Sequence, residues 1–202
     1  MTTPKSNIIK LDTSSSIWER FFTVAPLVVI GTKEPNGYSL APKHMATPLG
    51  QDNFFGFVCT PRHSTYHNVA REGFFTVSFP KPNQVVLASL AASPRCEQEG
   101  NEKLIMKGLP FLMASSIDAP FLEDSYLFFE CEHLNTIDGF GQYSLICGRI
   151  TSALVEEAYL RTAEKDEQEQ IYRSPLLAYL AYGRFAEIRE SLAFPFPRDF
   201  KN

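Results

Sequence analysis

Residues 39–79 carry the side chains best suited to chemistry, in two polar clusters. The first cluster is Leu40–Thr47, and the second is the turn Thr60–Thr65, which combines hydroxyl groups, a permanent cation and the predicted start of a helix. Two apolar runs, Phe54–Cys59 and Phe74–Phe79, flank the second cluster and predict strands. We expect the two clusters to meet around one anionic ligand.

The second cluster offers several donors for a phosphate group. A helix that begins near Thr65 leaves its first backbone N–H groups without partners, and its dipole favours negative charge there. Ser64 and Thr65 add hydroxyl groups, Arg62 adds a fork of N–H donors, and Asn68 follows one turn later. The alternative is that Ser64 only caps the helix and that Arg62 is a surface cation.

The pair His63 and His67 has the i, i+4 spacing of metal ligands on a helix. A third ligand would have to be His44 or a distant carboxylate, and the H-E-x-x-H pattern is absent. We therefore predict no metal site. The sequence also has no nucleophile elbow, P-loop or dinucleotide fingerprint, and we assign no catalytic side chain.

Composition excludes several classes of protein. A net charge of −4 over 202 residues argues against nucleic-acid binding. No apolar run approaches the roughly 20 residues of a membrane span, and the N-terminus has no signal-peptide pattern. The four cysteines, at positions 59, 96, 131 and 147, form no C-x-x-C pair. The expected compartment is the reducing cytoplasm.

The hydrophobic pattern predicts six strands, mostly antiparallel, at residues 27–32, 38–41, 53–59, 74–79, 126–134 and 143–155. Turns are expected at Asn36-Gly37 and Asp138-Gly139, and Pro42 is expected to stop the second strand. Predicted helices cover residues 16–22 (a capping box from Ser16 to Glu19), 64–71, 85–92 and 164–172, and 94–108 is expected to be a loop. The fold class is thus mainly β with inserted helices, a small β-barrel of the α+β type.

This order of elements resembles the flavin reductase-like family, whose fold is the FMN-binding split barrel. The family's N-x-A-P-x-S segment corresponds to Ser39–His44, and its R-K-D-T-x-x-N-I segment corresponds to Arg62–Val69. The resemblance covers about residues 20–160 of a single domain spanning 1–202, whose remainder is a C-terminal helix and a Phe-Pro tail, 161–202. His63 and Ser64 replace the usual Lys-Asp, and His44 replaces a common serine.

The resemblance implies an FMN site made of residues from both clusters. Arg62, Ser64 and Thr65 would hold the phosphate, with Asn68 bracing the loop. Backbone N–H groups of the first segment would face the isoalloxazine edge, and two residues at the end of a strand would line the ribityl chain. The residues in these two groups are Leu40, Ala41, Pro42, Lys43 and His44, and Cys59 and Thr60. Lys43 or His44 would stabilise reduced flavin, although Lys43 could equally be a solvated surface residue.

The activity implied is hydride transfer from NADH or NADPH to FMN and on to an unidentified acceptor, either a small molecule or a partner monooxygenase. Members of the family are commonly homodimers, and 17 phenylalanines fit burial against a second copy. A well-filled monomer core would explain the same number. Two other functions remain open: a non-catalytic flavin carrier or sensor, and a split barrel that binds heme through its histidines.

Overall fold

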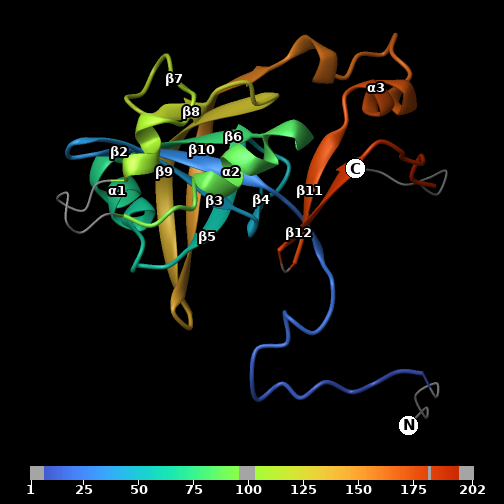
Figure 1. Ribbon diagram of the computed structural model, residues 1–202, viewed down its shortest axis with the longest axis horizontal. Coiled ribbons are helices and arrows are strands. Elements are labelled where there is room, and N and C mark those ends of the chain that lie inside the picture. The colour runs from blue at the N-terminus through green and yellow to red at the C-terminus, as the bar shows by residue number, and fades with distance from the viewer. Residues whose placement is uncertain (1–6, 96–102, 182, 196–202) are drawn as a thin grey trace.

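The computed structural model describes residues 7–95, 103–181 and 183–195. Its main feature is an antiparallel sheet of seven strands in the order β3-β2-β6-β9-β10-β5-β4, which curls into a half-barrel (Figure 1). The strands are β2 Val28–Glu34, β3 Gly37–Lys43, β4 Ala46–Pro48, β5 Phe54–Cys59, β6 Phe74–Phe79, β9 Leu127–Phe140 and β10 Tyr143–Val155. All six predicted strands are in this sheet. The predicted fold class, a mainly β split barrel, is confirmed.

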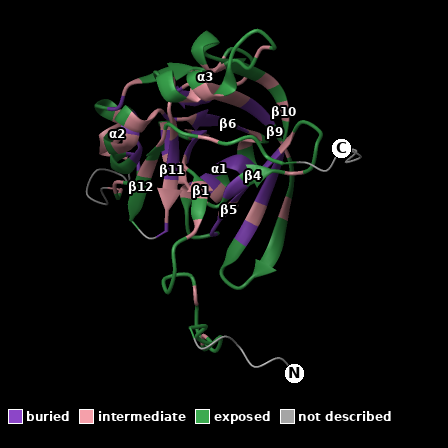
Figure 2. Cartoon of the chain, turned by 90° about the vertical axis from the view of Figure 1, so that its right-hand side faces the viewer, coloured by how far each residue is buried: buried purple, intermediate pink, exposed green. Residues whose placement is uncertain are grey.

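The inside of the half-barrel is filled by large apolar side chains from alternate strand positions. Phe57 and Phe75 are fully buried and meet edge to face with ring centroids 5.2 Å apart. Ile30, Val77 and Ile146 complete the same cluster. Figure 2 shows buried residues along the strands, whereas the far end of the β9–β10 hairpin is exposed. Because β5 and β6 both pack into this core, the two ends of the segment that joins these strands are fixed.

A second apolar cluster joins the outer side of the sheet to a short helix. This helix, α2 Val85–Leu90, follows the 3₁₀ turn η1 Pro82–Gln84. Its Ala88 packs with Val29 of β2 and Leu40 of β3. The loop predicted for residues 94–108 contains another 3₁₀ turn, η3 Leu104–Lys107, and Ile105 packs against the same cluster. The turn η3 therefore lies over β3.

Two smaller sheets flank the half-barrel, and the sequence analysis missed both. The hairpin β7 Phe111–Met113 and β8 Pro120–Leu122 comes so close to β2 that a Cβ on Gly31 would lie 1.8 Å from the Pro120 carbonyl oxygen. The other sheet has the order β1-β11-β12, formed by β1 Val24–Pro26, β11 Leu176–Leu180 and β12 Arg184–Ile188. In this sheet a strand from the C-terminal part of the described chain pairs with a strand from the N-terminal part.

Two predicted boundaries of strands were wrong. Pro42 does not stop the second strand, because β3 continues to Lys43. β3 is an edge strand, and the Leu40 carbonyl points away from β2 to the Lys103 ammonium. Backbone groups two residues apart in a strand point to the same side, so the Pro42 nitrogen also faces the open edge. An N–H is not needed there. Nor is Asp138-Gly139 the hairpin turn: β9 runs on to Phe140, which pairs with Tyr143.

The helices agree in part with the predictions. Residues 16–22 form only a turn, in which the Arg20 N–H donates to the Ile17 carbonyl at 2.9 Å. The helix α1 spans Ser64–Glu72, and its C-cap Gly73 has the left-handed φ of 76°. The helix α3 spans Glu167–Arg173 and starts later than predicted, because Asp166 caps it by accepting from the Glu169 N–H; the turn η4 Glu157–Tyr159 precedes it.

Phe196 and Pro197 of the Phe-Pro tail lie outside the described residues. None of the helices in the described part of the chain has the length and apolar character needed to cross a membrane.

Candidate functional site

The helix α1 presents its N-terminus to a cavity because the turn before it is tightly ordered. The Thr60 carbonyl accepts from the His63 N–H at 2.9 Å, and the Thr60 hydroxyl accepts from the Arg62 N–H at 3.4 Å. His63 is the N-cap but makes no side-chain cap. Ser64 is the first helical residue, so the alternative that Ser64 caps the helix is wrong. The free N–H groups of the first turn, with the positive end of the helix dipole, mark a place for an anion.

The cavity beside this N-terminus, here called the site cavity, has a volume of about 580 Å³. Residues of β3, of the turn before α1, of the end of α2 and of the following loop line it. Six of the residues predicted to bind FMN are among them: Ala41, Pro42, Lys43, Arg62, Ser64 and Thr65. The structure thus brings the two polar clusters of the sequence to one cavity, as expected.

Positive charge dominates the site cavity. Its lining includes four Lys or Arg residues and no Asp or Glu, although the whole chain carries a net charge of −4. The four cations are Lys43, Arg62, Arg95 and Lys103. Burial, followed by the charges of Lys43 and Arg62, lowers the pKa of His63, so this imidazole is neutral at pH 7. A lining of this charge attracts an anion.

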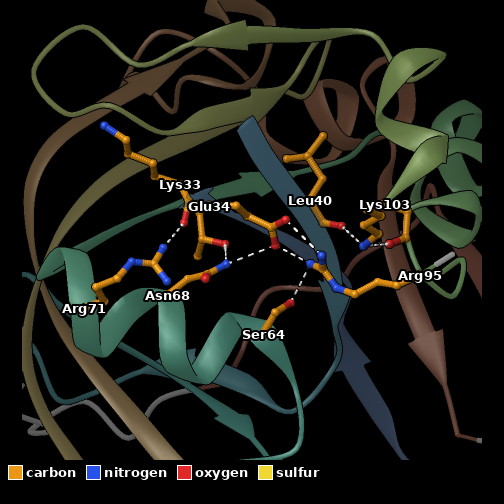
Figure 3. Close-up of polar contacts among 10 residues, drawn as sticks. Lys33, Glu34, Leu40, Ser64, Asn68, Arg71, Arg95 and Lys103 are labelled. Atoms are coloured by element: carbon orange, nitrogen blue, oxygen red, sulfur yellow. Dashed lines mark hydrogen bonds and ion pairs between the residues drawn. The ribbon is translucent and has the colours of Figure 1, made fainter. Parts of the chain in front are cut away.

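Arg95 is a site residue that the sequence analysis missed. Its guanidinium group forms an ion pair with Glu34 of β2 and donates to the Ser64 hydroxyl at 2.7 Å (Figure 3). Arg95 belongs to the segment predicted as a polar loop, and no local pattern links it to Ser64, which lies 31 residues earlier. Its guanidinium therefore reaches the start of α1 from a different part of the chain.

Lys103 is the second missed residue, and Figure 3 shows it beside β3. Its ammonium group donates to the carbonyls of Leu40 at 2.6 Å and Ala91 at 2.5 Å. An ammonium has three N–H donors, and the third has no partner among the described residues. Burial, followed by the charge of Arg95, lowers the pKa of Lys103 to about 8. Lys103 is thus a cation that can lose its proton close to physiological pH.

Three predicted residues support the site cavity without lining it. Cys59 and Thr60 are buried at the end of β5, where they order the turn before α1. Leu40 places its side chain in the second apolar cluster and only its carbonyl towards Lys103. The predicted contacts of Cys59 and Thr60 with a ribityl chain therefore stay predictions.

Asn68 lies one turn along α1 and joins this helix to β2, whereas its predicted role in bracing the loop stays a prediction. Its amide donates to the Thr32 hydroxyl at 3.0 Å and to the Glu34 carboxylate at 3.2 Å. Because Glu34 also holds Arg95, the two bonds connect α1, β2 and the loop after α2 in one network (Figure 3). Asn68, Ser64, Arg95 and Lys103 also line a neighbouring cavity of about 460 Å³.

The histidines do not form a common ligand set. His67 contacts the Pro61 carbonyl at 2.6 Å through Nε2, and His63 lines the site cavity. His44 turns away from both and stacks on Tyr179 of β11, with centroids 4.5 Å apart. Within residues 7–95, 103–181 and 183–195, no three His, Cys, Asp or Glu side chains gather as a metal site requires. The heme alternative has no support in this arrangement.

A comparison with protein families identifies the chain. The model of the flavin reductase-like domain matches residues 20–184. The chain belongs to the flavin reductase-like family. This match continues through β11 and β12, beyond the range of about 20–160 that the motifs suggested. A separate search of curated proteins finds no match.

Solved structures share the fold of this flavin reductase-like chain. Flavoredoxin from Methanosarcina acetivorans has a TM-score of 0.74 at 17% identity, with 96% of this chain and 97% of that chain covered. The FMN-binding protein from Thermus thermophilus with bound 1-cyclohex-2-enone has a TM-score of 0.72 at 20% identity, with coverage of 94% and 99%. The 2-nitrobenzoate 2-nitroreductase NbaA of Pseudomonas fluorescens has a TM-score of 0.69 at 18% identity, with coverage of 88% and 87%. At these identities the likeness shows the split-barrel fold.

Proposed function

We propose that the site cavity binds FMN and that the protein is an oxidoreductase which accepts hydride from NADH or NADPH. The observation that carries the proposal is the cluster of four cations, without any carboxylate in the lining, at the N-terminus of α1. This donor set fits a phosphate dianion, which needs several charge-assisted hydrogen bonds. The structural neighbours described as flavoredoxin and FMN-binding protein support the same ligand.

The phosphate is held by groups from two directions. Ser64 and Thr65 supply hydroxyls and first-turn N–H groups from α1, and Arg62 supplies its guanidinium from the preceding turn. Arg95 approaches from the loop after α2 and already donates to Ser64. Glu34 fixes the orientation of Arg95, and Asn68 fixes Glu34. Because the network exists without ligand, little reorganisation is needed on binding.

The ring system would lie along β3, where Ala41, Pro42 and Lys43 line the cavity. When bound, FMN supplies the hydride-accepting chemistry, and the protein supplies orientation and charge. Lys43 and Lys103 place positive charge beside the same strand, and such charge stabilises an anionic reduced ring. The electron acceptor, whether a small molecule or a partner monooxygenase, is not assigned.

Absorbance spectroscopy tests this proposal. The protein reconstituted with FMN should be yellow, and anaerobic addition of NADH or NADPH should bleach the flavin band within the time of a steady-state assay. A yellow protein that neither nicotinamide reduces would contradict the enzymatic activity and favour the carrier or sensor. A protein that stays colourless at saturating FMN would contradict the flavin site itself.

We also propose that the protein works as a homodimer in the reducing cytoplasm. Several large apolar side chains stay exposed near β1, among them Trp18, Val24 and Met45. Burial of such side chains is a common driving force for association. Cys59, Cys131 and Cys147 are all free and buried, which suits a reducing compartment.

A further inference from the structure

A separate cavity lies on the other side of Pro42 and Lys43 from the site cavity. Its volume is about 570 Å³, and it lies open to solvent between α2 and the β11–β12 hairpin; we call it the hairpin cavity. The two cavities share Pro42, Lys43 and Ala92 in their linings. A molecule in the hairpin cavity would therefore lie next to whatever occupies the site cavity along β3.

The walls of the hairpin cavity are largely apolar. Leu27 precedes β2, Val85, Ala88 and Leu90 belong to α2, and Phe185 belongs to β12. Leu90 and Phe185 are 42% and 52% exposed, so they stand at the mouth of the cavity rather than in a core. A volume of this size and an apolar lining suit a small organic molecule with one or two rings.

An aromatic pair forms part of the cavity wall in a fixed orientation. The His44 imidazole stacks on the Tyr179 ring with an interplanar angle of 27°. The Tyr179 hydroxyl accepts from the Gly183 N–H at 2.9 Å, and Gly183 has the left-handed φ of 75° that closes the β11–β12 turn. The Tyr179 side chain is thus fixed by stacking on its ring and by a hydrogen bond at its hydroxyl. A flat ligand ring can pack against this pair without a cost in side-chain ordering.

The charged groups of the hairpin cavity have one sign. Lys43 and Arg184 line it, whereas no Asp or Glu does. The exposed Arg184 side chain makes no ion pair or hydrogen bond with any described residue, and only its backbone pairs, with Leu180 of β11. An exposed guanidinium without a partner, at the mouth of an apolar cavity, offers the planar fork that matches a carboxylate.

We propose that the hairpin cavity binds an aromatic monocarboxylate, with the ring against His44 and Tyr179 and the carboxylate on Arg184. The ring accounts for the aromatic and apolar walls, and one carboxylate accounts for the single unpaired guanidinium. Binding of this ligand does not depend on the proposed flavin chemistry in the adjoining cavity, since every group named belongs to the protein.

Isothermal titration of the flavin-free chain with sodium benzoate and with benzamide tests the proposal. Benzamide has the same ring and size but no charge. Benzoate should bind saturably with one site per chain, and Arg184→Gln should weaken it about tenfold, the usual loss for one charge-assisted pair. Benzamide should bind more weakly than benzoate and should be unaffected by the substitution. Arg184→Lys should recover only part of the affinity, because an ammonium lacks the fork.

A second variant tests the position of the ligand. Leu90→Trp adds bulk at the mouth of the cavity on an exposed helix position, so the fold should persist. Benzoate binding should be lost, while the dissociation constant for FMN stays that of the unmodified chain. As a control, Arg173→Gln changes a distant exposed arginine of α3 and should leave benzoate binding unchanged.

Three results would overturn the proposal: equal affinities for benzoate and benzamide, unchanged benzoate binding in Arg184→Gln, or displacement of benzoate by FMN. The third would place benzoate in the site cavity. Failure of the proposed flavin chemistry gives a different result, because benzoate would still bind and respond to Arg184→Gln while NADH left FMN oxidised.

Discussion

Arg95 connects two elements that are far apart in sequence, β2 and α1. It pairs with Glu34, donates to Ser64 and, through Glu34, shares a partner with Asn68 of α1. An arginine held in this way adds a charge to the anion site while its own orientation is determined by the protein. Its effect on a ligand should therefore depend on the ligand's phosphate.

Arg95→Gln should weaken FMN binding about tenfold, because one charge-assisted hydrogen bond to the phosphate is lost. Riboflavin, which has no phosphate, should bind with unchanged affinity. Quenching of flavin fluorescence measures both dissociation constants. Equal losses for FMN and riboflavin would contradict a phosphate contact and would instead indicate a disturbed fold.

The lowered pKa of Lys103 predicts how FMN binding depends on pH. Burial lowers the pKa of Lys103 to about 8, so above that pH in the free protein the ammonium loses its charge and the attraction for phosphate falls. Below about pH 6 the phosphate itself gains a proton and loses charge. FMN affinity should therefore be highest between about pH 6 and 8.

Lys103→Met tests the origin of the alkaline limb. The variant should bind FMN more weakly at pH 7 and should lose the decrease near pH 8, while the acidic limb stays. An alkaline limb that persists in Lys103→Met would assign the titration to another group. Titration calorimetry at a series of pH values is the required measurement.

The residues of the site show what a sequence can and cannot predict. Arg62, Ser64 and Thr65 were predictable because a local turn and one helix start bring them together. Arg95 and Lys103 were not, because their contacts are set by the packing of α2 and η3 over β3. Residues joined only by tertiary structure leave no local pattern.

At the scale of elements, the close contact between β2 and β8 positions the start of the site network. Gly31 of β2 has no room for a side chain, because the Pro120 carbonyl oxygen and the Thr76 hydroxyl occupy the place of its Cβ. Three residues later, Glu34 holds Arg95. A shift of β2 would therefore reach the site.

Gly31→Ala should destabilise the protein by about 3 kcal/mol, because the new Cβ would overlap a backbone oxygen that cannot move without the β7–β8 hairpin. Gly108→Ala is a matched control, since its Cβ would lie 3.9 Å from the nearest atom and its φ of −117° suits alanine. Chemical denaturation measures both. A change below 1 kcal/mol for Gly31→Ala would show that the contact is loose.

The elements also show why predictions of boundaries failed. The apolar runs of the long strands were strong signals, whereas β1, β4, β7 and β8 have only three residues each and carry no detectable alternation. β11 was missed because β1, with which it pairs, lies more than 150 residues earlier, and β12 joins the same sheet through β11. The predicted end of β3 at Pro42 was wrong because an edge strand tolerates proline, and the position of β3 at the edge is known only from the sheet topology.

At the scale of the whole molecule, the exposed apolar side chains around β1 raise the question of assembly. Val24 is 72% exposed, and Met45 and Trp18 line the same surface cavity. In a homodimer these groups would be buried. The family resemblance implies a homodimer, and we propose that these exposed positions belong to its interface.

Light scattering coupled to size exclusion should give a mass near twice 22.8 kDa for the unmodified chain. Val24→Asp should shift the mass towards one chain, because a buried carboxylate without a partner is costly at an interface. A control, Leu154→Asp, changes an exposed apolar residue at the far end of β10 and should keep the dimer. A monomeric unmodified chain would contradict the proposal.

The proposed function depends on recognition of the FMN phosphate by the site cavity. Calorimetric titration of the unmodified chain with FMN and with riboflavin, at pH 7 and moderate salt, tests it most directly. We expect one site per chain and at least about a hundredfold tighter binding of FMN, since several charge-assisted hydrogen bonds contribute. Equal affinities for the two flavins, or no binding of FMN, would contradict the account.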